Sequence, residues 1–114
     1  MAAKVVQLEE GVRVTATTAQ QSFRDAADVG AAGKVVVQVN RLAAGAAGAL
    51  LTLEHAAILE ENHFEALSSQ TIALDGLGPI SVVISSHSRF LRWTLTQAAG
   101  SVSAFTIQLV LRDN

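Results

Sequence analysis

The chain has 114 residues, with no cysteine, no tyrosine, one proline and one tryptophan. Without cysteine the protein can form no disulfide, and it has no thiolate nucleophile and no cysteine–zinc site. No stretch approaches the roughly 20 apolar residues of a membrane helix. The first ten residues also lack the apolar run of a signal peptide. We therefore expect one domain over residues 1–114, made without a signal peptide.

Charged residues are scarce as well. They make up 16% of the chain, against 50% hydrophobic residues, and the net charge is −2. The eight lysines and arginines are scattered, whereas a nucleic-acid binder needs clustered cations to displace counterions from phosphate. A small protein with so few charges is poorly protected against association. The low content of charged residues has two interpretations. It reflects a bias of the chain toward alanine alone, or part of the apolar surface is covered by neighbouring molecules.

The apolar residues alternate with other residues in several segments. Every second residue is apolar over 105–111, and the same period of two recurs over 91–95 and 34–40. This period is typical of half-buried β-strands. Short strands at regular spacing, with turn residues such as 75–79 between them, indicate an antiparallel sandwich of about seven or eight strands. The expected core is Val35, Val37, Val39, Leu51, Leu53, Ile72, Leu74, Val82, Ile84, Leu91, Trp93, Leu95, Phe105, Ile107 and Leu109.

Segment 50–67 fits two structures. Its alanines, leucines and glutamates are strong helix formers, and Leu53, Phe64 and Leu67 lie near one stripe of a helix. The alternative is a strand to about His55, a loop, and a second strand from His63. The short strands on both sides favour the strand–loop–strand structure.

Histidines and glutamates gather in the same segment and raise the question of a metal site. The candidates are His55, His63, Glu54, Glu60, Glu61 and Glu65. Their spacing matches neither the His-Glu-x-x-His helix nor an oxygen-rich calcium loop. We interpret them as a solvated loop with two surface histidines, and we expect no metal ion and no organic cofactor.

A cluster of serines surrounds His87 in the segment 85–88. An activated serine also needs an orienting carboxylate and an oxyanion hole, and neighbours along a strand point to opposite faces. The Gly-x-Ser-x-Gly turn of the hydrolases is missing too. We therefore expect no catalytic residue here, and no enzymatic activity.

Trp93 is the one tryptophan, and Arg89 and Arg92 lie close to it in the sequence. An exposed tryptophan beside an arginine could bind a sugar ring. However, Trp93 shares its face of the expected strand with Leu91 and Leu95. We therefore expect it in the core.

Taken in order, four segments resemble a family of small virion structural proteins of tailed bacteriophages with a jelly-roll or discoidin-like β-sandwich. They are the β-branched strand and small-residue connection of 35–48, the segment 50–67, "RFLRW" at 89–93, and the Gly-Ser turn with its closing strand at 100–113. In this chain "AILEEN" replaces the family's tight Asp-Gly turn. The resemblance implies a jelly-roll-like sandwich without catalytic residues.

The resemblance implies a non-enzymatic component of a phage or phage-like particle, synthesised in the host cytoplasm and located in the virion. It would decorate or cement the capsid, or form part of the neck or tail, through symmetric interface burial. The expected partners are copies of itself and virion proteins such as the major capsid or tail protein, with neither nucleic acid nor membrane. The expected contact regions are 2–10, 26–33 and 43–48, which carry few long charged side chains. The alternative is a carbohydrate-binding sandwich for host attachment.

Overall fold

The structure is a computed structural model, and it describes residues 4–30, 32–43, 45 and 47–112, with the backbone alone at 68–70. These residues form nine β-strands and two short 3-10 helices. The strands are β1 (Lys4–Val14), β2 (Thr18–Gln20), β3 (Ala27–Asp28), β4 (Lys34–Ala43), β5 (Leu50–Ala56), β6 (Glu65–Ala73), β7 (Gly78–Ile84), β8 (Phe90–Thr96) and β9 (Ser103–Arg112). The 3-10 helices are η1 (Phe23–Asp25) and η2 (Glu61–His63). In this part of the chain no helix is long and apolar enough to cross a membrane.

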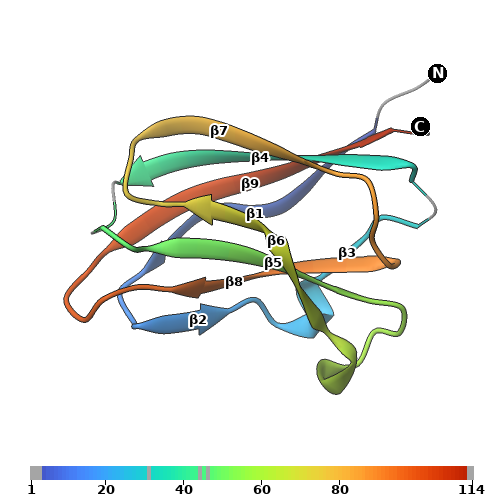
Figure 1. Ribbon diagram of the computed structural model, residues 1–114, viewed down its shortest axis with the longest axis horizontal. Coiled ribbons are helices and arrows are strands. Elements are labelled where there is room, and N and C mark those ends of the chain that lie inside the picture. The colour runs from blue at the N-terminus through green and yellow to red at the C-terminus, as the bar shows by residue number, and fades with distance from the viewer. Residues whose placement is uncertain (1–3, 31, 44, 46, 113–114) are drawn as a thin grey trace.

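The strands form two antiparallel sheets packed face to face (Figure 1). Sheet A has the order β1-β9-β4-β7, and sheet B has the order β2-β8-β5-β6 with β3 also paired to β8. Early strands pair with late ones: β1 with β9, β2 with β8, β4 with β7, and β5 with β6. A long hairpin rolled into two sheets in this way is a jelly roll. The all-β, jelly-roll-like sandwich expected from the sequence is confirmed, with the short strands β2 and β3 bringing the number of described strands to nine.

The core lies between the inner faces of the two sheets. The residues expected there are buried, except that Val82 on the edge strand β7 is half-buried. The core also contains residues outside the expected set, namely Leu8, Val14, Ala27, Val29 and Ala49. Trp93 packs edge-to-face on Phe105 with the ring centroids 5.1 Å apart, which centres the core on β8 and β9.

The first strand belongs to the body of the fold. β1 pairs with β9 along its length, and its register shifts between Gln7 and Glu9 and again before Val12. Gly11 has a φ of 59°, which glycine adopts without strain. The bulged strand buries Leu8, and the carbonyl of Leu8 accepts a hydrogen bond from the side chain of Gln21. Residues 4–10 are therefore part of the edge strand of sheet A, with Leu8 buried, and their expected role in contacts stays a prediction.

The expected contact region 26–33 is partly internal. Ala27 and Val29 in region 26–33 are buried because β3 pairs with β8. Residue 31 of this region, and residues 44 and 46 of region 43–48, lie outside the described residues.

Segment 50–67 is strand–loop–strand. Leu51 and Leu53 are fully buried, whereas Leu50 is exposed, which is the alternation of a strand. The chain then leaves β5 at Ala56, passes through η2 and returns as β6. Pairing of β5 with both β6 and β8 outweighs the helical preference of its residues.

Candidate protein-binding surfaces

The candidate metal ligands lie apart or are occupied by other contacts. Nδ1 of His55 accepts a hydrogen bond from the backbone N–H of Ser88 at 3.0 Å. Nε2 of His63 lies 3.4 Å from a carboxylate oxygen of Glu60. Within the described residues no group of three or more histidines and carboxylates could hold a metal ion. The absence of a physiological metal stays a prediction.

His87 contacts the backbone instead of a serine hydroxyl. Nδ1 lies 2.7 Å from the carbonyl oxygen of Ser88, and Nε2 lies 3.0 Å from that of Ala32. A carbonyl oxygen can only accept, so a neutral ring donates to one of the two, and the tautomer decides which. The ring ties the loop before β4 to the loop before β8.

The three residues considered for sugar binding are separated by the fold. Trp93 is 4% exposed, and its Nε1 donates a hydrogen bond to Oε1 of Glu9 at 3.1 Å. Arg89 is exposed and donates two-pronged hydrogen bonds to Asp28. These bonds hold the pKa of the Asp28 carboxyl below its ordinary value and raise the pKa of Arg89. Trp93 is a core residue, as expected, and cannot stack on a sugar.

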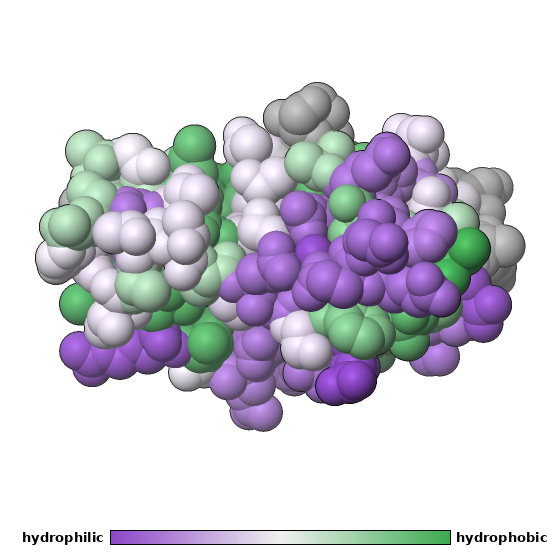
Figure 2. Space-filling model, turned by 90° about the horizontal axis from the view of Figure 1, so that it is seen from below, coloured by the Kyte–Doolittle hydropathy of each residue, from purple (hydrophilic) through white to green (hydrophobic). Residues whose placement is uncertain are grey.

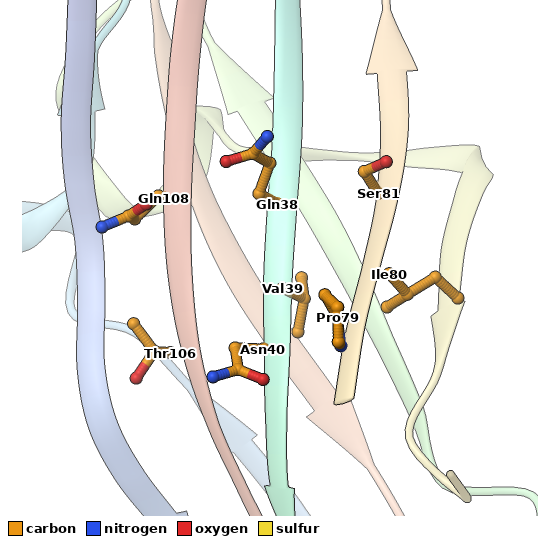
Figure 3. Close-up of a pocket in the computed structure, with 8 residues that line it drawn as sticks. All are labelled: Gln38, Val39, Asn40, Pro79, Ile80, Ser81, Thr106 and Gln108. Atoms are coloured by element: carbon orange, nitrogen blue, oxygen red, sulfur yellow. The ribbon is translucent and has the colours of Figure 1, made fainter. Parts of the chain in front are cut away.

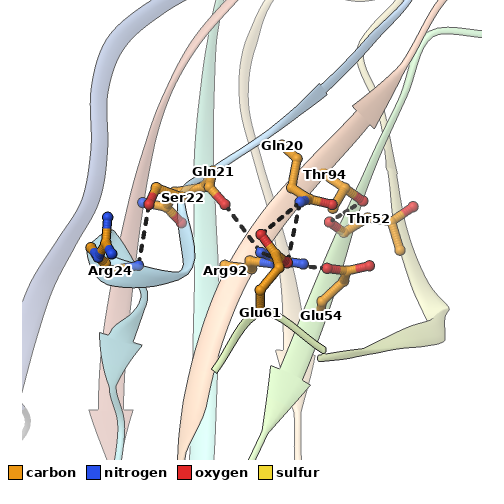
Figure 4. A network of polar contacts seen from close by, with 9 residues as sticks. All are labelled: Gln20, Gln21, Ser22, Arg24, Thr52, Glu54, Glu61, Arg92 and Thr94. Atoms are coloured by element: carbon orange, nitrogen blue, oxygen red, sulfur yellow. Dashed lines mark hydrogen bonds and ion pairs between the residues drawn. The ribbon is translucent and has the colours of Figure 1, made fainter. Parts of the chain in front are cut away.

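Arg92 lies between Leu91 and Trp93 and therefore points to the outer face of sheet B. It is 3% exposed all the same, because the β5–β6 loop covers it. Nε donates to Oε1 of Glu54 at 2.8 Å, and Nη1 lies 2.7 Å from Oε2 of Glu61 (Figure 4). The guanidinium also stacks over the ring of Phe64, 4.3 Å from its centroid. Arg92 thus anchors the loop to sheet B.

We call residues 57–65 the acidic loop. Its tip exposes Ile58 and Leu59, which are 51% and 38% exposed, directly before Glu60 and Glu61. Figure 2 shows the lower surface of the molecule, where hydrophilic residues gather over the half that contains η1 and η2. Apolar atoms are visible among them. An anchored loop with an apolar tip and an acidic rim is suited to contact another protein.

The outer face of sheet A is the second candidate surface. Strand register aligns one side chain from each strand into a row across the sheet. The valine row consists of Val5, Val110, Val36 and Val83. The amide row beside it consists of Gln7, Gln108, Gln38 and Ser81. Val5 and Val83 are 61% and 53% exposed, and neither row contains a charged residue.

A shallow hollow of about 670 Å³ lies on the same face. Figure 3 shows Gln38 and Asn40 on β4 between Gln108 and Thr106 on β9 and the residues of β7. The lining supplies amide and hydroxyl groups but neither an acid nor a base, and it contains no aromatic ring. This chemistry favours binding over catalysis.

Reasoning from the sequence did not identify either surface as a site. The signal for the valine row was present in the run Val35–Val37, which puts a valine on both faces of one strand. The row itself depends on which strands become neighbours, and that is set by the topology. No family model matches the chain, and neither a curated protein nor a solved structure shows significant similarity to it.

Proposed function

We propose that the protein is a non-enzymatic structural component of a phage or phage-like particle, acting through its protein-binding surfaces. The observation that carries the proposal is the pair of charge-free rows, the valine row and the amide row, on the outer face of sheet A. Charged side chains are depleted at the centres of protein interfaces, because they are costly to dehydrate. The resemblance of segments 35–48 and 89–93 to virion sandwich proteins supports the particle as its setting.

The contact would bury this face against a shell protein, a tail protein or another copy of the chain. Sheet A presents four paired strands, about 4.8 Å apart, and the two rows span the full width of the sheet. A preformed sheet face loses little conformational entropy when it is covered. The proposal covers four places on the particle: capsid decoration, capsid cement, the neck and the tail. Experiments with particles decide among them.

The test is co-sedimentation of the purified protein with particles made from the genome that encodes it. We expect the wild-type chain to sediment with the particles. Gln38→Lys places a charge at the centre of the amide row, and we expect it to abolish binding. Thr18→Lys, on the exposed face of β2 in sheet B, is the matched control and should still bind. A wild-type protein that never co-sediments with shells or tails contradicts the proposal.

A carbohydrate-binding module is the rival function. Its strongest residue, Trp93, is buried, so the remaining place for a sugar is the amide-lined hollow. Binding of glycans that is lost in Asn40→Ala, together with no binding to particles, would favour the rival.

A further inference from the structure

The tip of the acidic loop and the valine row of sheet A are both apolar and exposed, and the charges beside them have opposite signs. In the acidic loop, Ile58 and Leu59 lie directly before Glu60 and Glu61, whose side chains are 62% and 55% exposed. A partner that covered this tip would need an apolar surface next to positive charge.

The outer face of sheet A has that combination. Lys34 and Arg112 are paired across β4 and β9, two residues along their strands from Val36 and Val110. Two residues of strand correspond to about 7 Å, so these cations border the valine row. In the acidic loop the two acids follow the apolar pair directly, so both surfaces combine apolar side chains with neighbouring charges of opposite sign.

We propose that copies of this chain associate head to tail, with the acidic loop of one copy docked on the valine row of the next. Ile58 and Leu59 would cover the valines, and Glu60 would lie near Lys34 and Arg112 of the second copy. The inference rests on the proposed function and deepens it, because it names the partner and the contact.

The positions of the two surfaces set the kind of assembly. The acidic loop joins two strands of sheet B and is anchored to the outer face of that sheet through Arg92. The valine row lies on the outer face of sheet A, so the body of the sandwich separates the two surfaces. A contact between different surfaces is heterologous, and it repeats from copy to copy until it closes a ring or extends a filament.

The contact is small. Two aliphatic side chains and a charged rim cover much less than the roughly 800 Å² per partner of a standard interface. We therefore expect weak association of the free protein, strengthened where many copies are held side by side or a ring closes. Salt should weaken it further, because the charges of the rim are exposed.

The absence of cysteine from the chain allows a direct test by cross-linking. The variant combining Leu59→Cys with Val36→Cys has one thiol on each surface. A disulfide needs Cα atoms within about 7 Å, so the two thiols cannot join within one molecule across the sandwich. Under mild oxidation we expect a ladder of dimers, trimers and longer chains on non-reducing gels. The matched control combines Leu77→Cys with Val36→Cys. Leu77 is 66% exposed in the β6–β7 turn, at the opposite end of the molecule from η2 (Figure 1).

Charge reversal in the same cysteine background tests the rim. Lys34→Glu should slow cross-linking about threefold to fivefold, because it replaces the attraction of an exposed charge pair by repulsion. Adding Glu60→Lys to the same chain should restore the rate, since the new lysine of one copy meets the new glutamate of the next. Far-UV circular dichroism of each variant establishes that it is folded.

The proposal is overturned if the control pair of cysteines forms the same ladder, or if the test pair forms dimers alone. It is also overturned if Lys34→Glu leaves the cross-linking rate of the test pair unchanged. Dimers alone would indicate symmetric packing of two sheet A faces. Co-sedimentation with particles is scored separately. If the protein binds to particles but forms no cross-linked ladder, the head-to-tail contact is refuted and the proposed function stands. If it neither binds to particles nor forms a ladder, both proposals are refuted.

Discussion

Replacing Arg92 by methionine removes the anchor of the acidic loop while keeping most of the side chain's volume. Arg92 is 3% exposed, and it contacts Glu54, Glu61 and the ring of Phe64. The substitution leaves Glu54, 18% exposed, without its partner. The variant therefore tests whether this buried charge holds the loop on sheet B.

The expected loss follows from the exposure of the two partners. Removing one side of a buried ion pair costs about 3–5 kcal/mol, because the other charge stays buried and unpaired. Glu61 is 55% exposed, so water compensates most of its loss, and that pair contributes less than about 1 kcal/mol. Methionine recovers part of the packing on Phe64. We expect a decrease in the free energy of unfolding of about 2–3 kcal/mol, near the lower end of the range for a buried pair.

Urea unfolding followed by tryptophan fluorescence measures this loss, because Trp93 is the single tryptophan and lies in the core. Double-mutant cycles with Glu54→Gln and Glu61→Gln divide it between the two pairs. The coupling of Arg92 to Glu54 should be the larger of the two. Hydrogen exchange over the acidic loop should speed up in the methionine variant. A change below about 0.5 kcal/mol, the range of an ordinary surface substitution, refutes the reasoning.

Three further predictions follow from the same structure. Phe105→Ala should lower the free energy of unfolding by about 3–5 kcal/mol, because it empties the centre of the core; an urea midpoint near that of the wild type contradicts this. Deleting residues 2–10 should unfold the domain, since it removes most of β1; a cooperative thermal transition in the truncated chain would show otherwise. Asp28→Asn should lower stability at pH 7, where the wild-type carboxylate pairs with Arg89. Because the folded pKa of Asp28 is lowered, this contribution is present above the unfolded pKa of about 3.9 and is lost as the pH falls through the folded value. The melting temperatures of the two proteins should therefore converge in acid, and a gap that widens there contradicts the pairing.

Much of the core could be predicted because strand alternation is a local signal. Phe105, Ile107 and Leu109 are spaced by two, and each is fully buried. The same rule failed in β1, where the bulges between Gln7 and Val12 shift the register and break the alternation. Leu8 keeps the spacing of two from Val6. The bulge, however, brings Glu9 opposite the buried Ile107, where it accepts a hydrogen bond from Trp93, and a period of two does not predict this.

The candidate surfaces could not be predicted because they join residues distant in the sequence. Val5 and Val110 become neighbours when β1 pairs with β9, and Val36 joins them through β4. The burial of Arg92 likewise depends on Glu61, which the loop brings back over sheet B. Local patterns indicated which residues form strands, whereas the order of the strands determines which side chains form a surface.

The central claim is that this sandwich is a structural part of a particle. It is tested most directly by quantitative mass spectrometry of purified particles made from the genome that encodes the chain. We predict that the chain is present at a fixed ratio to the major capsid or tail protein. A high-salt wash should leave this ratio unchanged if the contact to that protein is made by the charge-free valine and amide rows of sheet A. Particles that are complete and infectious without any copy of the chain would contradict the account.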